Sequence, residues 1–274
     1  MTSKAAARTV DTGPMLRRER EGQIAVLTLN RPQARNSLSE ALLGELSAAL
    51  AQIATDRNIR AVVIAAAGPV FCAGHDLKEL TARRSDADGG RAYFTQIMNA
   101  CSATMQQIVT LPQPVIAAVQ GVASAAGCQL VASCDLAVAS AAAKFVTPGV
   151  DIGLFCSTPM VALSRNVPSK AAMEMLLTGD MASADDAVRI GLVNRVVKAG
   201  EERTAAVALA QKIAGKSAFT VRLGKEGFYK QAEMGLADAY RYVSQVMVEN
   251  LLAADAEEGI GAFIEKRDPT WKDR

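Results

Sequence analysis

The sequence predicts a globular α/β protein in which loops at the ends of strands build the functional site. Strand, loop and helix patterns recur from Ile24 to Val146, without a GxGxxG phosphate loop. The chain after Thr158 reads almost wholly helical. Half of the 274 residues are apolar, so a sizeable core can be buried.

The N-terminal half supplies the strands. Ile24 to Leu29 alternates and is β-rich, and the turn Asn30-Arg31-Pro32 ends it before Ser37 or Ser39 caps a helix to about residue 54. Apolar runs predict further strands, whereas a segment of small residues and a segment with apolar residues at helical spacing predict helices. Strands are expected at 24–29, 61–66, 115–119, 136–139 and 144–146, with helices at about 91–109 and 125–133 and a loop at 147–158.

The C-terminal half alternates apolar faces with charge at helical spacing. Helices are expected at 169–177, 183–190, 201–214 and 236–254. In the last of these, Tyr240, Val243, Met247 and Leu251 form one apolar stripe, which is typical of a core or a subunit interface. We therefore divide the chain into a flexible tail (1–20), an α/β core (21–200) and a helical oligomerisation region (201–274).

Composition argues against several classes of partner. The formal charge is only +2 and no run of Lys or Arg exceeds two residues, so nucleic acid is not expected as a partner. The most apolar segment, 115–132, is interrupted by Gln and Gly, which argues against a membrane span. Five cysteines without a CxxC pair suit reduced thiols, and no metal site is expected. We expect a cytoplasmic protein, or a mitochondrial matrix protein if the N-terminus is a targeting segment.

Three segments in order resemble the enoyl-CoA hydratase/isomerase, or crotonase, superfamily. They are PVFCAGHDLKEL at 69–80, PVIAAVQGVASAAGCQLVASCDLAVAS at 114–140 and KFVTPGVDIGLFCSTP at 144–159. The resemblance runs from about residue 20 to residue 272. It implies the spiral crotonase fold of strand-strand-helix units, with C-terminal helices that assemble trimers.

The first two motifs suit a site that stabilises a negatively charged thioester oxygen. Such an oxygen needs preorganised N–H donors on loops small enough to approach the substrate. The resemblance implies the amide of His75 as one donor and the amide of Ala126 as the other. The second amide opens the predicted helix 125–133, whose N-terminus carries a partial positive charge.

The resemblance also shows what is missing. Hydratases of this family add water with two glutamates, and the motifs place Gln129 at the first position and Gly149 at the second. Neither side chain titrates near neutral pH, so ordinary hydration is not expected. The isomerase mechanism that relies on the second glutamate is doubtful for the same reason.

Other groups are candidates for the missing proton transfer. Asp151 would share a side with Gly149 if that stretch is extended, beside the space that the absent side chain leaves. It is otherwise a surface or loop-capping residue. The imidazole of His75, the only histidine, is either an acid or base or part of the pocket wall. Cys156 and Ser157 are candidates for lining the pocket.

Coenzyme A is expected as part of the substrate, with no permanently bound cofactor. The resemblance implies that Ala34, Arg35 and Ala73 contact it, with the Arg35 charge available to a phosphate. It implies that Phe263 and Lys266 reach the adenosine end, Lys266 from a neighbouring subunit. A solvated lysine at a helix end is the alternative for Lys266.

Three hypotheses follow. The first is an enzyme that stabilises an enolate or tetrahedral oxyanion of an acyl-CoA and catalyses isomerisation, thioester hydrolysis or weak hydration. The second is a non-catalytic acyl-CoA binding or scaffold protein. The third is a true hydratase in which Asp151 or His75 does the work. In each case a homotrimer, or a dimer of trimers, is expected.

Overall fold

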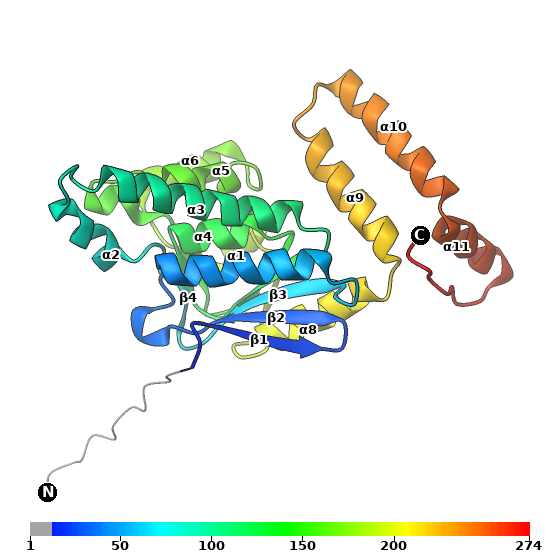
Figure 1. Cartoon of the computed structure of the whole chain (residues 1–274), viewed down its shortest axis with the longest axis horizontal. Helices are drawn as coiled ribbons and strands as arrows, with labels where there is room; N and C mark the ends of the chain where they lie inside the picture. Colours follow the sequence, from blue (N-terminus) through cyan, green and yellow to red (C-terminus); the bar gives the residue numbers. More distant parts are fainter. Residues whose placement is uncertain (1–12) are drawn as a thin grey trace, which may run out of the picture.

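The computed structural model describes residues 13–274 and contains two sheets (Figure 1). The six-stranded sheet has the order β1-β2-β3-β5-β7-β10 and is parallel except for the antiparallel pair β1 and β2. Its strands are β1 (Leu16–Glu21), β2 (Ile24–Leu29), β3 (Ala61–Ala66), β5 (Val115–Val119), β7 (Leu136–Ser140) and β10 (Arg195–Val197). The four-stranded sheet comprises β4 (Val70–Cys72), β6 (Val122–Ser124), β8 (Lys144–Val146) and β9 (Ala182–Ser183).

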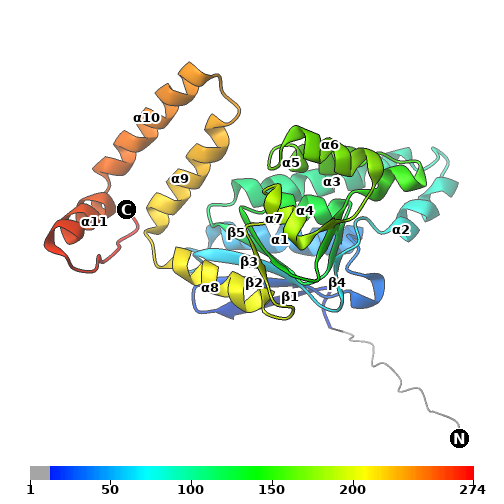
Figure 2. The ribbon, with the colours of Figure 1, turned by 180° about the vertical axis from the view of Figure 1, so that it is seen from behind.

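Helices cover both faces of the larger sheet (Figures 1 and 2). They are α1 (Glu40–Thr55), α2 (Leu77–Ala82), α3 (Arg91–Thr110), α4 (Ala126–Ser133), α5 (Ser157–Leu163), α6 (Ser169–Thr178), α7 (Ala184–Arg189), α8 (Glu202–Ala214), α9 (Ala218–Gln231), α10 (Leu236–Leu252) and α11 (Ala254–Glu265), with 3-10 turns at Pro32–Ala34, Arg83–Ser85 and Pro148–Ile152. Alternate residues of β2 belong to two cores: Leu27 packs on the side of α1 and α3, and Val26 packs against α8. Burial on both faces explains why the parallel strands are continuous apolar runs.

The structure corrects the predicted boundaries. Residues 16–20 were assigned to a flexible tail, but they lie in β1, where Leu16 is buried and the charged side chains face solvent at the sheet edge. Residues 1–12 of that tail lie outside the described part. Five strands were missed: β1 because it is highly charged, and β4, β6, β9 and β10 because they are only two or three residues long. Helix α8 packs on the sheet, so the predicted division at residue 201 cuts through the core.

Helices α9 to α11 form an arm that projects from the core (Figures 1 and 2). A buried ion pair fixes its base, since Lys225 Nζ lies 2.7 Å from Asp135 Oδ2 and Tyr229 donates to the same carboxylate. The C-terminal segment ties the arm to the core a second time, through Asp273 and Arg60. The chain itself therefore sets the direction of the arm.

The described part shows two further features that bear on the predictions. All five cysteines are buried free thiols, as expected for reduced cysteines. Among residues 13–274, every helix is too short or too polar to cross a lipid bilayer.

Helix α4 begins immediately after a residue with an unusual backbone. Ala125 has φ 49° and ψ −115°, a conformation that side chains disfavour, and its N–H donates to Val146 O at 2.9 Å. Two residues on, a side chain on Gly127 would overlap the carbonyl of Cys72, so α4 is pressed against β4. The turn into α4 stores backbone strain to make this close contact.

We predict that Ala125→Gly stabilises the protein by about 1 kcal/mol, because relief of the strain exceeds the extra entropy of glycine in the unfolded chain. Thermal unfolding should shift upward by about 2 °C. Ala126→Gly is the matched control, since Ala126 is helical and should lose stability on the same change. A lower melting temperature for Ala125→Gly would show that the turn carries no strain.

Candidate active site

The loop after β4 and the turn before α4 meet at Gly74 and Ala125. Gly74 has φ 92°, and a side chain there would lie 3.0 Å from Cβ of Ala125 and 3.4 Å from the amide nitrogen of Ala126. Only glycine adopts this conformation at such a close approach. The residues next to the two predicted amide donors are therefore in contact.

The amide of His75 is available to a ligand. Leu38 pairs with His75 in an isolated parallel bridge, in which Leu38 donates to Gly74 O at 2.8 Å and accepts from the amide of Asp76 at 3.4 Å. In this pattern the bonds of the bridge go to the neighbours of His75, so its own N–H points away from Leu38. Within residues 13–274 it has no hydrogen-bond partner.

The amide of Ala126 is available for a different reason. Ala126 is the first residue of α4, and the first N–H groups of a helix have no partner within the helix. Its side chain is buried and the aligned peptides of α4 add a partial positive charge at this end. Two unpaired N–H groups thus flank the Gly74–Ala125 contact, as an oxyanion site requires.

The loop between β2 and α1 is held to the segment between β3 and β4 by Asn36, a fully buried residue that the sequence did not single out. Its amide group donates to Ala67 O at 2.9 Å and Val70 O at 2.8 Å and accepts from Arg31 N at 2.8 Å. Asn36 has φ 52°, a conformation that asparagine tolerates. A short loop with an asparagine before a capped helix is the only signal that could have found it.

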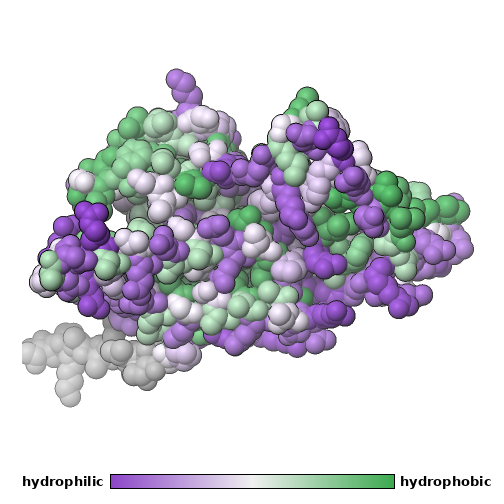
Figure 3. All heavy atoms as spheres, turned by 45° about the horizontal axis from the view of Figure 1, so that its top comes forward, coloured by the Kyte–Doolittle hydropathy of each residue, from purple (hydrophilic) through white to green (hydrophobic). Residues whose placement is uncertain are grey.

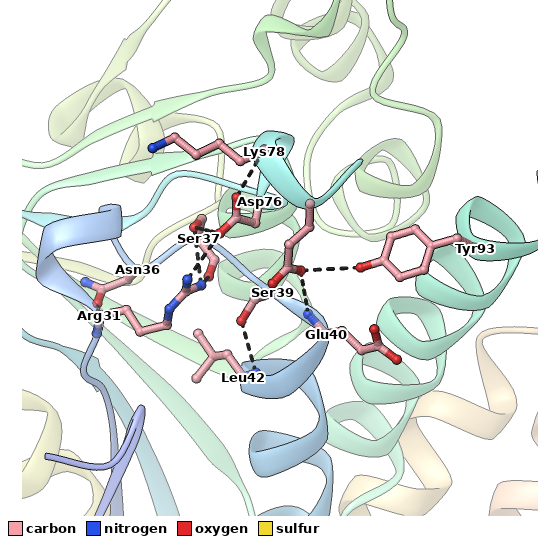
Figure 4. A network of polar contacts seen from close by, with 10 residues as sticks. Arg31, Asn36, Ser37, Ser39, Glu40, Leu42, Asp76, Lys78 and Tyr93 are labelled. Atoms are coloured by element: carbon pink, nitrogen blue, oxygen red, sulfur yellow. Dashed lines mark hydrogen bonds and ion pairs between the residues drawn. The ribbon is translucent and has the colours of Figure 1, made fainter. Parts of the chain in front are cut away.

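Asp76 ties the same loop to α2 (Figure 4). The Arg31 guanidinium lies 3.2 Å from its carboxylate, Ser37 Oγ donates to it, and it caps α2 through the amide of Lys78. Burial opposes ionisation of Asp76, but these donors outweigh it and lower its pKa. The charge of Asp76 is therefore used to fix the loop.

The residues predicted to bind coenzyme A fall into two groups. Arg35 is exposed, and its carbonyl accepts a hydrogen bond from Ala73 at 3.0 Å, so Ala34, Arg35 and Ala73 lie together beside the His75 loop. Phe263, which is 84 % exposed, and Lys266 lie at the end of α11 on the arm. In Figure 1 the arm and this loop are at opposite sides of the core.

The two positions without glutamates differ in their surroundings. Gln129 is buried in α4, and Cys101 of α3 contacts its Oε1 at 4.0 Å. The prediction that the missing side chain of Gly149 leaves open space beside it is wrong. A side chain on Gly149 would lie 3.0 Å from Leu154 O and 3.1 Å from both the amide nitrogen and Sγ of Cys156, because the chain folds back there.

The stretch from Gly149 to Asp151 is not extended, which favours the alternative of a surface Asp151. These residues form the 3-10 turn Pro148–Ile152, and the exposed Asp151 carboxylate lies against Gly179 at the end of α6. Ser157 opens α5, is exposed, and donates to Phe155 O at 3.3 Å. Burial raises the pKa of the Cys156 thiol, although the backbone of Gly149 partly offsets this.

The His75 ring is enclosed. Both ring nitrogens are buried and lack a hydrogen-bond partner within residues 13–274. Burial lowers the pKa of the imidazole, so the ring is neutral at pH 7. The ring and the amide of this residue therefore have different surroundings.

Comparisons with known proteins agree with this architecture. A family profile described as "Enoyl-CoA hydratase/isomerase" matches residues 19–274. The rat "Enoyl-CoA hydratase domain-containing protein 3, mitochondrial" is 48% identical over 254 residues, which cover 93% of this chain and 83% of the rat protein. A probable enoyl-CoA hydratase of Rhizobium meliloti is 34% identical over 93% of this chain and 97% of its own length.

Solved structures agree as well. The structure of human enoyl-CoA hydratase domain-containing protein 3 has a TM-score of 0.89 at 46% identity and covers 94% of this chain and 100% of its own. That of an enoyl-CoA hydratase from Mycobacterium smegmatis has a TM-score of 0.90 at 49% identity and covers 94% and 99%. The predicted crotonase fold is confirmed, and the chain belongs to the enoyl-CoA hydratase/isomerase family.

Proposed function

We propose that this protein is an enzyme that binds an acyl-CoA thioester and stabilises negative charge on its carbonyl oxygen through the amides of His75 and Ala126. The observation that carries the proposal is the close approach of Gly74 to Ala125 and Ala126. It brings the unpaired N–H groups of His75 and Ala126 near each other. Coenzyme A enters as part of the substrate, with Ala34 and Arg35 near its nucleotide and Ala73 also in contact with it.

Side chains contribute less to the proposed chemistry than backbone does. Asp151 lies against Gly179 at the end of α6, and both ring nitrogens of His75 are buried. The raised pKa of Cys156 argues against a nucleophilic thiolate. A reaction that depends mainly on an oxyanion, such as thioester hydrolysis, fits better than hydration or than an isomerisation that relies on the second glutamate.

A non-catalytic acyl-CoA binding protein is the second candidate. The crowding at Gly149 favours it, because even the first carbon of a side chain there would lie 3.0 Å from Leu154 O and 3.1 Å from the amide nitrogen and Sγ of Cys156. The two candidates differ in turnover. Purified protein is incubated with saturated, 2-enoyl and 3-enoyl CoA esters, and mass spectrometry follows the products. Binding without any product would favour the second candidate.

Assembly and location are part of the proposal. Large apolar side chains are exposed along the arm and over α5 and α6 at the other end of the molecule (Figure 3). Tyr240, Met247 and Leu251 are among them, whereas Val243 is half-buried. A trimer or dimer of trimers would cover such surfaces and bring Phe263 and Lys266 to a neighbouring site. The names of the vertebrate relatives favour the mitochondrial alternative over the cytoplasm.

Ala126→Pro should weaken both thioester affinity and any turnover, because proline removes the proposed donor. The loss of turnover should be about 10²-fold or more, as for other oxyanion donors. Ala126→Gly retains the N–H and serves as control. Unchanged affinity in calorimetry and unchanged turnover in a folded Ala126→Pro protein would remove Ala126 from the site.

Crotonyl-CoA hydration should be slower than in a two-glutamate relative by at least about 10²-fold, since a general acid or base contributes that much or more. Introducing Gln129→Glu with Gly149→Glu should restore little, because the second side chain collides with Leu154 and Cys156. The check is a spectrophotometric hydration assay on the wild type and the double variant. A rate comparable with the relative, in either protein, would contradict the account.

The free energy of unfolding should decrease as the pH decreases, because the His75 ring is largely buried in the folded protein. Its folded pKa is lowered, so stability present above the unfolded pKa of about 6.5 is lost as pH falls from there toward the folded pKa. The slope from one proton is at most about 1.4 kcal/mol per pH unit. His75→Gln lacks this proton, and urea unfolding from pH 7.5 to 5 measures the difference. Parallel curves for the two proteins would show that the ring is not held neutral.

A further inference from the structure

The carboxylate of Glu79 joins three helices. Glu79 lies in the first turn of α2 and is partly buried. Its Oε2 accepts from the amide of Glu40, the first residue of α1, at 3.0 Å and from Tyr93 Oη of α3 at 3.4 Å (Figure 4). Burial and the charge of Glu79 raise the pKa of the Tyr93 phenol, so the phenol stays protonated and remains a donor. Two donors from separate helices therefore hold one carboxylate, at the end of α1 where negative charge is favoured.

The loop of His75 lies between two attachments to the start of α1. Leu38 bridges to the residues on either side of His75, and two residues after Leu38 the amide of Glu40 binds Glu79. The bond from the Asp76 amide to Leu38 O is long, at 3.4 Å, so the bridge alone holds this side of the loop weakly. The contact of Glu79 supplies the second attachment.

Helix α2 begins two residues after His75, so a shift of α2 moves the amide of that residue. A displacement of about 1 Å is enough to remove much of the value of a preorganised donor. We propose that Glu79 is a positioning residue: by holding α2 to α1 and α3, its carboxylate fixes the amide of His75 toward the thioester oxygen. Glu79 acts in this way through His75 and not on the substrate. This inference rests on the proposed oxyanion site.

A pair of ligands isolates the contribution of the carbonyl oxygen. Butyryl-CoA carries the thioester carbonyl, and S-butyl-CoA is the thioether of the same chain length without it. In calorimetry the wild-type protein should bind the ester about 20-fold more tightly than the thioether, the effect of two neutral hydrogen bonds. Equal affinity for the two ligands, or binding of neither, would overturn the proposed function and the inference with it.

Variants of Glu79 test the inference by itself. Glu79→Met keeps the length of the side chain and removes the acceptor, so the preference for the ester should fall about fivefold, the share of one hydrogen bond, while S-butyl-CoA affinity is retained. Glu79→Gln keeps an acceptor oxygen and should retain most of the preference. Glu40→Met is the matched control, because it removes a neighbouring carboxylate but keeps the amide that Glu79 binds.

Three results would overturn the inference and leave the proposed function standing. They are an unchanged preference in folded Glu79→Met, an equal loss of affinity for both ligands, and a loss of preference in Glu40→Met as large as that in Glu79→Met. If Glu79→Met does not fold, Glu79→Asp takes its place with the same expectation, because it keeps the charge but is one methylene too short to reach the start of α1.

Discussion

The contact between Gly74 and the Ala125-Ala126 turn is the constraint on which the rest of the site depends. It permits no side chain at Gly74 and holds Ala125 at a positive φ, and it sets the start of α4 where an unpaired amide faces the loop of His75. Gly127 extends the constraint, because α4 lies against the carbonyl of Cys72. Small residues are therefore required here for geometry, and the donors that result are backbone groups that no side-chain substitution can replace.

The remaining structure serves to hold these two loops still. The large sheet is buried on both faces, so the strands that deliver the loops have little freedom. Asn36 then joins the loop after β2 to the segment between β3 and β4, and the Arg31–Asp76 pair joins it to the loop after β4. Such fully satisfied polar groups specify one loop geometry, because any other arrangement leaves a buried donor or acceptor unpaired. Preorganised amides need this rigidity, since their catalytic value comes from not having to reorganise.

Much of the fold could be predicted because its signals are local. Ile24–Leu29, Ala61–Ala66 and Val115–Val119 are apolar runs of strand length, and Ser39 caps α1 as expected. The charged strand β1 could not be predicted, because only its pairing with β2 makes it a strand. The motifs indicated the positions of the two amides, but the surroundings of Gly149 depend on how residues 153–156 fold back. The Cys101–Gln129 contact joins two helices across the core, and no pattern along the chain reports it.

Two backbone amides, and not a pair of carboxylates, are the central element of this account. The proposed action of these amides would be visible on the ligand itself, since hydrogen bonds to a carbonyl oxygen weaken its C=O bond. The most direct measurement is the difference infrared spectrum of a butyryl-CoA labelled with ¹³C at its thioester carbonyl, free and bound to the wild-type protein. The account predicts that the carbonyl band moves to lower frequency on binding. A bound ester whose carbonyl band stays at the frequency found in water would contradict it.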